Sequence, residues 1–223
     1  MCGRVNVSDN EGVRQLLEAM GMETWPSREP RFNVAPTQVL DVVAMQQQAP
    51  KLQPMSWGVS ITVNGKKGQI TRRVQNSRSD KIWTSRMWKP LISCNRVLVP
   101  INGFYEWRRR NKKVEAVFHI TPTRLRAMFL AGIYRNTATP AGEPEVSIVT
   151  TEANESMAPI HDRMPVILAS RNAAMAWLQD DDRESLNELM QPANNESLIF
   201  TQVGDYVNKS SNEGHECIEP LVA

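Results

Sequence analysis

The stretch Arg96–Trp107, which reads RVLVPINGFYEW, decides the fold because an apolar run leads directly into a polar break and three aromatic residues. The run Arg96–Ile101 has the length and the β-branched content of a buried strand. Five other runs have the same character: Val39–Met45, Val114–Ile120, Ala127–Ile133, Val146–Thr151 and Leu198–Thr201. These runs predict a protein that is built mainly from strands.

Three segments instead show the period of a helix. In Asp9–Met20 the apolar side chains fall on one stripe, and Ser8 with Glu11 forms a capping-box pattern. The other two segments are Arg171–Leu178 and Arg183–Met190. Residues 24–37 are rich in proline and arginine and predict an irregular segment.

Strands and helices do not alternate regularly, so a βαβ arrangement is not expected. Of the 223 residues, 41% are hydrophobic and 22% are charged, which is the composition of a globular protein. No repeat or linker divides the chain. We therefore expect one α+β domain over residues 1–223, with a mainly antiparallel, barrel-like core and a few peripheral helices.

Composition also narrows the function classes. The 26 lysines and arginines nearly balance the 24 aspartates and glutamates, so nucleic-acid binding would require a local patch. Three cysteines do not make a disulfide framework and favour a reducing compartment. No apolar run approaches the roughly 20 residues of a membrane span, and the N-terminus lacks the apolar core of a signal peptide. We expect a soluble cytoplasmic protein without membrane contact.

Cys2 is the most informative single residue. A small second residue permits removal of the initiator methionine, which would leave an α-amine and a thiol on neighbouring carbons. The α-amine has a pKa of about 7.7–8.0, so much of it is neutral near pH 7, and a thiolate is a strong nucleophile. An amine and an aldehyde form an imine, on which the thiol can close to give a five-membered thiazolidine. The alternative is that the cysteine at position 2 has no functional role.

Two residues are candidates for moving protons. Glu106 lies among three aromatic residues, where desolvation suits a carboxylate to proton transfer near neutrality. His161 lies in a polar island between Pro159 and Pro165, which restrain the backbone on both sides and suit an acid/base role. The same sequence patterns are also compatible with a glutamate on the solvent-exposed face of a strand and with a histidine in an ordinary surface loop.

Polar and basic residues gather in two further places. Asn76 can orient an amine or a carbonyl, and Arg78 can grip a phosphate bidentately. The basic clusters are Lys66, Lys67, Arg72, Arg73 and Arg78, and then Arg108–Arg110 with Lys112 and Lys113. Trp57, Phe104, Tyr105 and Trp107 offer stacking surfaces, and together these residues favour a nucleic-acid face. The alternative to a nucleic-acid face is structural. Arg78 would then lie in a solvated turn, Arg108–Lys113 would form the tip of a hairpin, and the aromatic residues would pack in the core.

Other site classes have little support. The three cysteines and three histidines show no paired ligand spacing, so we expect no metal and no cofactor. The chain also lacks a GxGxxG pattern, a P-loop and a nucleophile-elbow motif.

Taken together, these motifs occur in an order that resembles the SOS-response-associated peptidase (SRAP) family of abasic-site-processing proteins. The matching segments extend over almost the whole chain: Met1–Arg4, Phe32–Thr37, Trp57-Gly58, Asn76–Arg78, Ser85–Pro90, Gly103–Trp107 and Ile160–Pro165. Any one of these segments is weak evidence, whereas the combination of Cys2, the Gly-Phe-Tyr-Glu-Trp run and the His-Asp-Arg run is specific.

The resemblance implies a sensor of abasic sites in single-stranded DNA that shields the lesion during the response to DNA damage. Its terminal Cys2 would be joined through a thiazolidine to the opened deoxyribose, and Asn76, Glu106 and His161 would surround it. The residues implied to contact DNA are Arg4, Asn33, Pro36, Arg78 and Arg163, to which Trp107 adds a stacking surface. We expect an exposed Cys2 in a pocket with the carboxylate and the imidazole, in a monomer that joins the nucleoid when it binds DNA.

One segment departs from the family pattern, and two other functions stay open. Residues 59–74 lack the adjacent tryptophans that wedge against DNA bases in some members and are basic instead. The same Cys2 site would also fit a thiol peptidase, with hydrolase or lyase-type activity. The third reading is a non-covalent binder of modified or single-stranded DNA.

Overall fold

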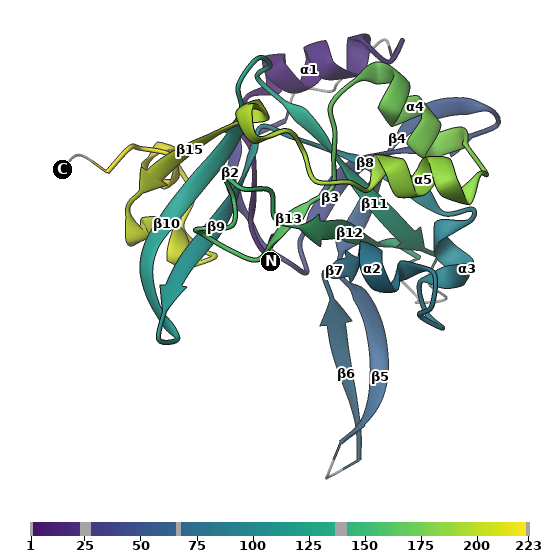
Figure 1. Cartoon of the computed structure of the whole chain (residues 1–223), viewed down its shortest axis with the longest axis horizontal. Coiled ribbons are helices and arrows are strands. Elements are labelled where there is room, and N and C mark those ends of the chain that lie inside the picture. The colour runs from purple at the N-terminus through teal and green to yellow at the C-terminus, as the bar shows by residue number, and fades with distance from the viewer. Residues whose placement is uncertain (1, 23–27, 66–67, 137–141, 222–223) are drawn as a thin grey trace.

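The computed structural model describes residues 2–22, 28–65, 68–136 and 142–221, and strands predominate in it (Figure 1). The strands are β1 (Val5–Val7), β2 (Arg31–Val34), β3 (Val39–Gln46), β4 (Ala49–Trp57), β5 (Val59–Gly65), β6 (Gly68–Val74), β7 (Asn76–Arg78), β8 (Arg96–Ile101), β9 (Gly103–Arg110), β10 (Lys113–Pro122), β11 (Met128–Arg135), β12 (Glu145–Glu152), β13 (Arg163–Pro165), β14 (Ile167–Leu168) and β15 (Leu198–Val203). The helices are α1 (Asn10–Glu18), α2 (Ser79–Ile82), α3 (Lys89–Ile92), α4 (Arg171–Gln179) and α5 (Arg183–Leu189), with 3₁₀ turns at η1 (Asn195–Ser197), η2 (Asp205–Asn208) and η3 (His215–Cys217).

The larger sheet closes into a ring. Strands β12, β4, β3, β8 and β11 pair in that order, and β11 pairs back onto β12. Most pairs are antiparallel, but β12 runs parallel to both β4 and β7. The β12–β4 contact spans two residue pairs, Glu145 with Ser56 and Val146 with Trp57, so the ring is not a regular barrel. The predicted α+β fold with a barrel-like core is confirmed in this looser form.

The smaller sheet carries the N-terminal strand. Its order is β15-β10-β9-β1-β2, and every pair in it is antiparallel. Val5 of β1 pairs with Phe104 of β9, so the residues that precede β1 run beside the part of β9 that contains Glu106. A separate hairpin of β5 and β6 extends away from the body (Figure 1).

Strand β8 divides the apolar core into two clusters because alternate side chains point to opposite faces of a strand. Val97, Val99 and Ile101 pack in the cluster that contains Cys2, whereas Leu98 packs in the cluster under the helices. All six residues of β8 are buried, as its apolar run predicts.

The other predicted strands and helices are largely confirmed. Strands β3, β8, β10, β11, β12 and β15 match the six apolar runs with bounds that shift by at most two residues, and α1, α4 and α5 match the three helical segments. The capping prediction for α1 was wrong. Asp9 is the N-cap and accepts a hydrogen bond from the Gly12 N–H, because the Ser8 hydroxyl instead donates to Asn6 Oδ1 at 2.7 Å.

The irregular segment predicted over residues 24–37 was wrong in part. Arg31–Val34 form β2, because pairing with β1 supplies the hydrogen bonds that the local sequence does not signal. Residues 23–27 lie outside the described part of the chain. Within that described part, no helix is long and apolar enough to cross a membrane.

Candidate active site and nucleic-acid interface

Strand pairing positions the predicted chemical residues. Cys2 lies three residues before the start of β1, the strand that pairs with β9 and so runs beside the strand that carries Glu106. Asn76 begins β7, and His161 lies two residues before β13. Strands β7 and β13 flank β12, since Thr150 pairs with Arg78 of β7 and also with Pro165 of β13.

Asn76 contacts Cys2 directly. Its Nδ2 donates a hydrogen bond to the Cys2 carbonyl oxygen at 2.9 Å, and both residues are buried. The Oδ1 atom of Asn76 is buried and has no hydrogen-bond partner among the described residues. Leaving such an acceptor unpaired costs about 1–3 kcal/mol. The amide is therefore suited to a donor that arrives beside residue 2, such as an amine.

The Cys2 thiol is enclosed. Cys2 exposes none of its surface and packs in one cluster with Val5, Phe104 and Met164. Burial, and after it the charge of Glu106, raises the pKa of the thiol far above its ordinary value, while a hydrogen bond from the Arg4 backbone acts in the opposite direction. The thiol is therefore protonated at neutral pH and a poor nucleophile. The exposed Cys2 that we expected is not found in this chain, whose sequence retains Met1.

Glu106 lies almost entirely out of solvent, with 4% of its surface exposed. Its Oε1 accepts a hydrogen bond from the Trp107 backbone N–H at 3.2 Å. Its burial agrees with the expectation that this glutamate is withdrawn from solvent, whereas a role in proton transfer stays a prediction. A buried carboxylate whose charge acts on the Cys2 thiol is placed to accept or donate a proton at residue 2.

His161 is three-quarters buried, and its Nδ1 faces two competing partners. The Arg163 backbone N–H donates to Nδ1 at 3.0 Å, and Asp162 Oδ1 lies 2.8 Å from the same nitrogen. A neutral ring that accepts from Arg163 carries its proton on Nε2, whereas an imidazolium would pair with Asp162 instead. The Nδ1 atom therefore has a hydrogen-bond partner whether or not it carries a proton. Met164, three residues further on, packs in the same cluster as Cys2.

Two of the residues predicted to contact DNA form a two-arginine cluster, Arg78 and Arg163 with Asp80 between them. Arg78 donates to Asp80 through Nε at 3.1 Å and through Nη2 at 3.0 Å. Arg163 Nη1 lies 3.2 Å from Asp80 Oδ1, and its Nη2 donates to the Thr150 carbonyl oxygen at 2.6 Å. The Arg163 side chain is 9% exposed and that of Arg78 is 54% exposed. Asp80 was not predicted, and its one sequence signal is its place two residues after Arg78.

The other predicted contacts form what we call the C-terminal clamp: Arg4, Asn33 and Trp107 bound to residues 207–212. Asn33 is fully buried, and its amide nitrogen faces the carbonyl oxygens of residues 207, 209 and 212 at 2.8–3.2 Å. Arg4 Nη1 donates to Asn33 Oδ1 at 2.6 Å and to the Val207 carbonyl at 2.8 Å. The Trp107 indole N–H donates to Asn208 Oδ1 at 2.6 Å. These side chains hold the C-terminal segment, and their role at a DNA surface stays a prediction.

Pro36 and the basic residues occupy turns and hairpins. Pro36 is half-buried in the turn between β2 and β3. The tip of the β9–β10 hairpin, residues 109–115, is exposed, with Arg108 next to it paired to Glu115 at 2.8 Å. On β6, Arg72 is exposed, and Arg73 Nη1 donates to Ser56 Oγ at 2.7 Å. Lys66 and Lys67 lie outside the described residues.

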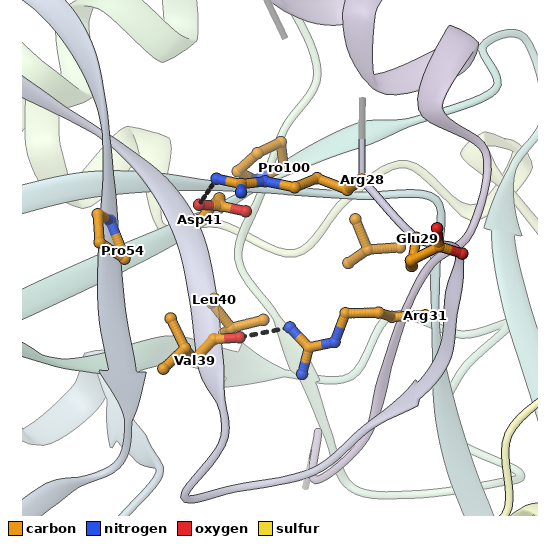
Figure 2. A pocket seen from close by; sticks show the side chains of 9 residues that line it. Arg28, Glu29, Arg31, Val39, Leu40, Asp41, Pro54 and Pro100 are labelled. Atoms are coloured by element: carbon orange, nitrogen blue, oxygen red, sulfur yellow. Dashed lines mark hydrogen bonds and ion pairs between the residues drawn. The ribbon is translucent and has the colours of Figure 1, made fainter. Parts of the chain in front are cut away.

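Two surface pockets are lined by other parts of the chain. A cavity of about 740 Å³ lies beside α1, α4 and β14. A smaller cavity of about 280 Å³ is drawn in Figure 2, where Arg28 pairs with Asp41 and Arg31 reaches the Val39 carbonyl. Neither pocket includes Cys2 or the residues around it. Within the described ranges, no group of three or more His, Cys, Asp and Glu side chains is arranged to hold a metal ion.

Comparison with protein-family models matches residues 1–210 to the family described as "SOS response associated peptidase (SRAP)". Among curated proteins, the chain is 32% identical over 227 residues to abasic site processing protein YoqW of Bacillus subtilis, covering 98% of this chain and 99% of the relative. It is 29% identical to abasic site processing protein YedK of Escherichia coli, covering 99% of this chain and 100% of that one.

Similarity extends to a vertebrate protein and to a solved structure. Abasic site processing protein HMCES of Gallus gallus is 28% identical over 268 residues, covering 99% of this chain and 78% of that protein. The crystal structure of a protein from Bacteroides thetaiotaomicron superimposes with a TM-score of 0.78 at 19% identity, covering 97% of this chain and 100% of that one. This structural likeness supports the fold described above.

Proposed function

The chain belongs to the SOS response associated peptidase family, and we propose that it captures abasic sites in single-stranded DNA covalently through Cys2. Its curated relatives are named abasic site processing proteins. The observation that carries the proposal is the meeting of three residues from distant parts of the chain. Asn76 contacts the Cys2 backbone, and the Glu106 charge acts on the Cys2 thiol.

Removal of Met1 is the step that activates the site in this proposal. It creates an α-amine on Cys2, the residue whose carbonyl oxygen contacts the Asn76 amide and whose thiol is acted on by the charge of the buried Glu106 carboxylate. A polar amine inside an apolar cluster requires hydrogen-bond partners, and these two groups accept hydrogen bonds. Crosslinking also requires that the buried thiol becomes accessible to the sugar in the processed chain.

The first chemical stage joins the amine to the sugar. An abasic deoxyribose is in equilibrium with an open-chain aldehyde, and His161 and Glu106 move the protons that ring opening requires. The neutral α-amine of Cys2 attacks the aldehyde carbon, which forms a C–N bond and a carbinolamine. Glu106 then protonates the leaving hydroxyl, which departs as water and leaves an imine.

The second stage closes the thiazolidine. The Cys2 sulfur bonds to the imine carbon, and the thiol proton ends on the nitrogen, so the whole sequence releases one water molecule. The amine and the thiol belong to one residue, which makes ring closure an intramolecular step. The closed ring resists hydrolysis better than the imine does, so the lesion stays covered.

The two-arginine cluster supplies the DNA contacts of this proposal. Arg78 and Arg163 lie on the two strands that flank β12, beside the segments that carry Asn76 and His161. Arginine grips phosphate through its planar fork. A single strand can bend its sugar toward Cys2, whereas a sugar inside a duplex is sterically hindered. Affinity should therefore decrease as the salt concentration increases.

The direct test is denaturing electrophoresis of the processed protein after incubation with an abasic single-stranded oligonucleotide. The wild type should form a band that survives denaturation, and Cys2→Ala should form none. Cys2→Ser and Cys2→Ala both keep the α-amine and lack the thiol, so each should give an adduct only when borohydride traps the imine. Cys94→Ser changes an exposed cysteine that follows α3 and should crosslink like the wild type.

Three outcomes would contradict the proposal. A full yield of adduct from Cys2→Ala without borohydride would place the chemistry at another residue. Turnover of added peptides without any DNA adduct would instead indicate a thiol peptidase, and tight binding without an adduct would indicate a non-covalent binder.

A further inference from the structure

We propose that Asp80 is a specificity-determining residue that occupies the position of a DNA phosphate between Arg78 and Arg163 and so weakens binding to undamaged strands. The inference rests on the proposed function, because it assumes that these two arginines contact DNA. It adds a role for a carboxylate that takes no part in the covalent chemistry.

The geometry of the two-arginine cluster carries the inference. Arg78 grips Asp80 with Nε and Nη2, at 3.1 and 3.0 Å, each bond reaching a different carboxylate oxygen. This is the bidentate arrangement in which a guanidinium binds a phosphate. Arg163 adds a contact of 3.2 Å to one of those oxygens. The carboxylate therefore holds the edge of Arg78 that a phosphate would use.

Arg163 is the buried member of the cluster. Its side chain is nine-tenths buried, and its Nε atom is covered and has no hydrogen-bond partner among the described residues. An incoming phosphate has access to the cluster through Arg78 and Asp80, whose side chains are 54% and 41% exposed. Its contacts would form at the fork of Arg78, the position that the Asp80 carboxylate holds.

Asp80 competes as a charged group throughout the neutral range. The hydrogen bond from Arg78 lowers the pKa of Asp80 below its ordinary value, and the charge of Arg163 acts in the same direction. A phosphate must therefore displace Asp80 from the Arg78 fork or share the cluster with a second negative charge. Either way, non-covalent binding to any strand is weakened, and retention on DNA depends on the covalent bond at Cys2.

The test uses intact single-stranded oligonucleotides, which offer phosphates but no aldehyde. Asp80→Asn keeps the shape of the side chain and removes its charge. Exposed ion pairs contribute about 0.2–1 kcal/mol, so this variant should bind intact DNA about two- to fivefold more tightly. One additional phosphate contact on a single strand should also steepen the slope of log K against log salt by about 0.7. Asp80→Glu keeps the charge and should bind like the wild type.

A matched control separates this effect from net charge. Asp41 pairs with Arg28 at 2.9 Å in the pocket of Figure 2, away from the two-arginine cluster. Asp41→Asn makes the same change in charge and should leave the salt slope unchanged. Thermal unfolding of each variant checks that it is folded, and Asp80→Ser provides a second neutral variant.

The inference is overturned if both neutral variants bind intact DNA with the wild-type affinity and salt slope, or more weakly. Weaker binding would show that Asp80 only positions the arginines. An equal gain in Asp41→Asn would also overturn it, because net charge would then explain the result. Failure of the proposed function looks different, since the wild type would then form no adduct with abasic DNA.

Discussion

The two faces of strand β9 contact different parts of the molecule. Phe104 packs in the cluster that contains Cys2, and the Glu106 charge acts on the Cys2 thiol. On the opposite face, Tyr105 and Trp107 pack with Val207, which belongs to the segment held by the C-terminal clamp. Alternation of side chains along one strand thus places the proposed proton-transfer residue Glu106 on one side and the contacts to the C-terminal segment on the other. A change at one position should therefore affect either crosslinking or stability.

The residues predicted to contact DNA are divided between these two settings. Arg4 and Asn33 bind backbone carbonyls of the C-terminal segment, which no ligand can replace without opening the fold. Arg78 binds the side chain of Asp80, which can move aside. The difference teaches that an arginine bound to an exchangeable carboxylate is the better candidate for a phosphate contact.

The largest effect should come from the chemical face. Glu106→Gln removes a proton-transfer group and should slow crosslinking by about 10²–10⁴-fold while the protein stays folded. Adduct formation against time, with abasic single-stranded DNA in excess, measures the rate. Glu115→Gln alters an exposed glutamate at the tip of the β9–β10 hairpin and provides the control. A wild-type rate in Glu106→Gln would remove the carboxylate from the mechanism.

In the C-terminal clamp, Asn33→Ala should lower the free energy of unfolding by about 3 kcal/mol. The substitution leaves buried backbone carbonyls without a hydrogen-bond donor. For a chain of this length the melting temperature should fall by roughly 6–12 °C. Calorimetry measures the change, and the exposed Asn64 on β5 provides a control substitution to Ala. Unchanged stability with lost DNA affinity would instead make Asn33 a DNA contact.

His119 adds a pH dependence to the same face. Its ring stacks on Tyr105 with centroids 4.9 Å apart, and burial lowers its pKa to about 4 from an ordinary value near 6.5. The unfolded chain therefore takes up this proton at a higher pH than the folded chain does. The contribution of His119 to stability should be complete well above pH 6.5 and should decrease by about 3 kcal/mol as the pH falls to 4.

Chemical denaturation between pH 7 and pH 4 measures this dependence. His119→Phe keeps an aromatic ring in the stack and should flatten the pH profile. His215→Gln alters an exposed histidine and should leave the profile as it is in the wild type. An unchanged profile in His119→Phe would assign the acid sensitivity to other groups.

The smallest effect is expected at Trp107. Trp107→Phe loses the hydrogen bond to Asn208 and should lower the free energy of unfolding by about 1 kcal/mol. The phenyl ring still offers a stacking surface, so affinity for single-stranded DNA should stay the same. Fluorescence anisotropy with a labelled oligonucleotide measures that affinity. A loss of affinity without a loss of stability would move Trp107 from the clamp to the DNA interface.

The sequence predicts those parts of the fold whose signal is local. The buried run of β8 and the apolar stripe of α1 contain enough residues to show their period. Strands β1, β7 and β13 have three residues each and exist because of pairing across the sheet, so no local pattern indicates them. The motifs around Asn76 and Glu106 predicted both as candidate site residues, and in the fold Asn76 contacts the Cys2 backbone while the charge of Glu106 acts on the Cys2 thiol.

The rest of the site depends on contacts between distant residues. Nothing in the letters around Asn33 indicates that its amide binds residues 207–212, because those partners lie more than 170 positions away. The enclosure of Cys2 likewise comes from side chains such as Phe104 and Met164. The position of Asp80 two residues after Arg78 is its one sequence signal, and that signal does not indicate the contact with Arg163, which the fold alone creates.

The most direct test of the covalent account is the intact mass of the processed protein after reaction with an abasic oligonucleotide. The account predicts one adduct whose mass equals protein plus oligonucleotide minus one water. Chemical blocking of the α-amine, with the thiol left free, should abolish it. An adduct of the same mass and yield from the amine-blocked protein would contradict the account.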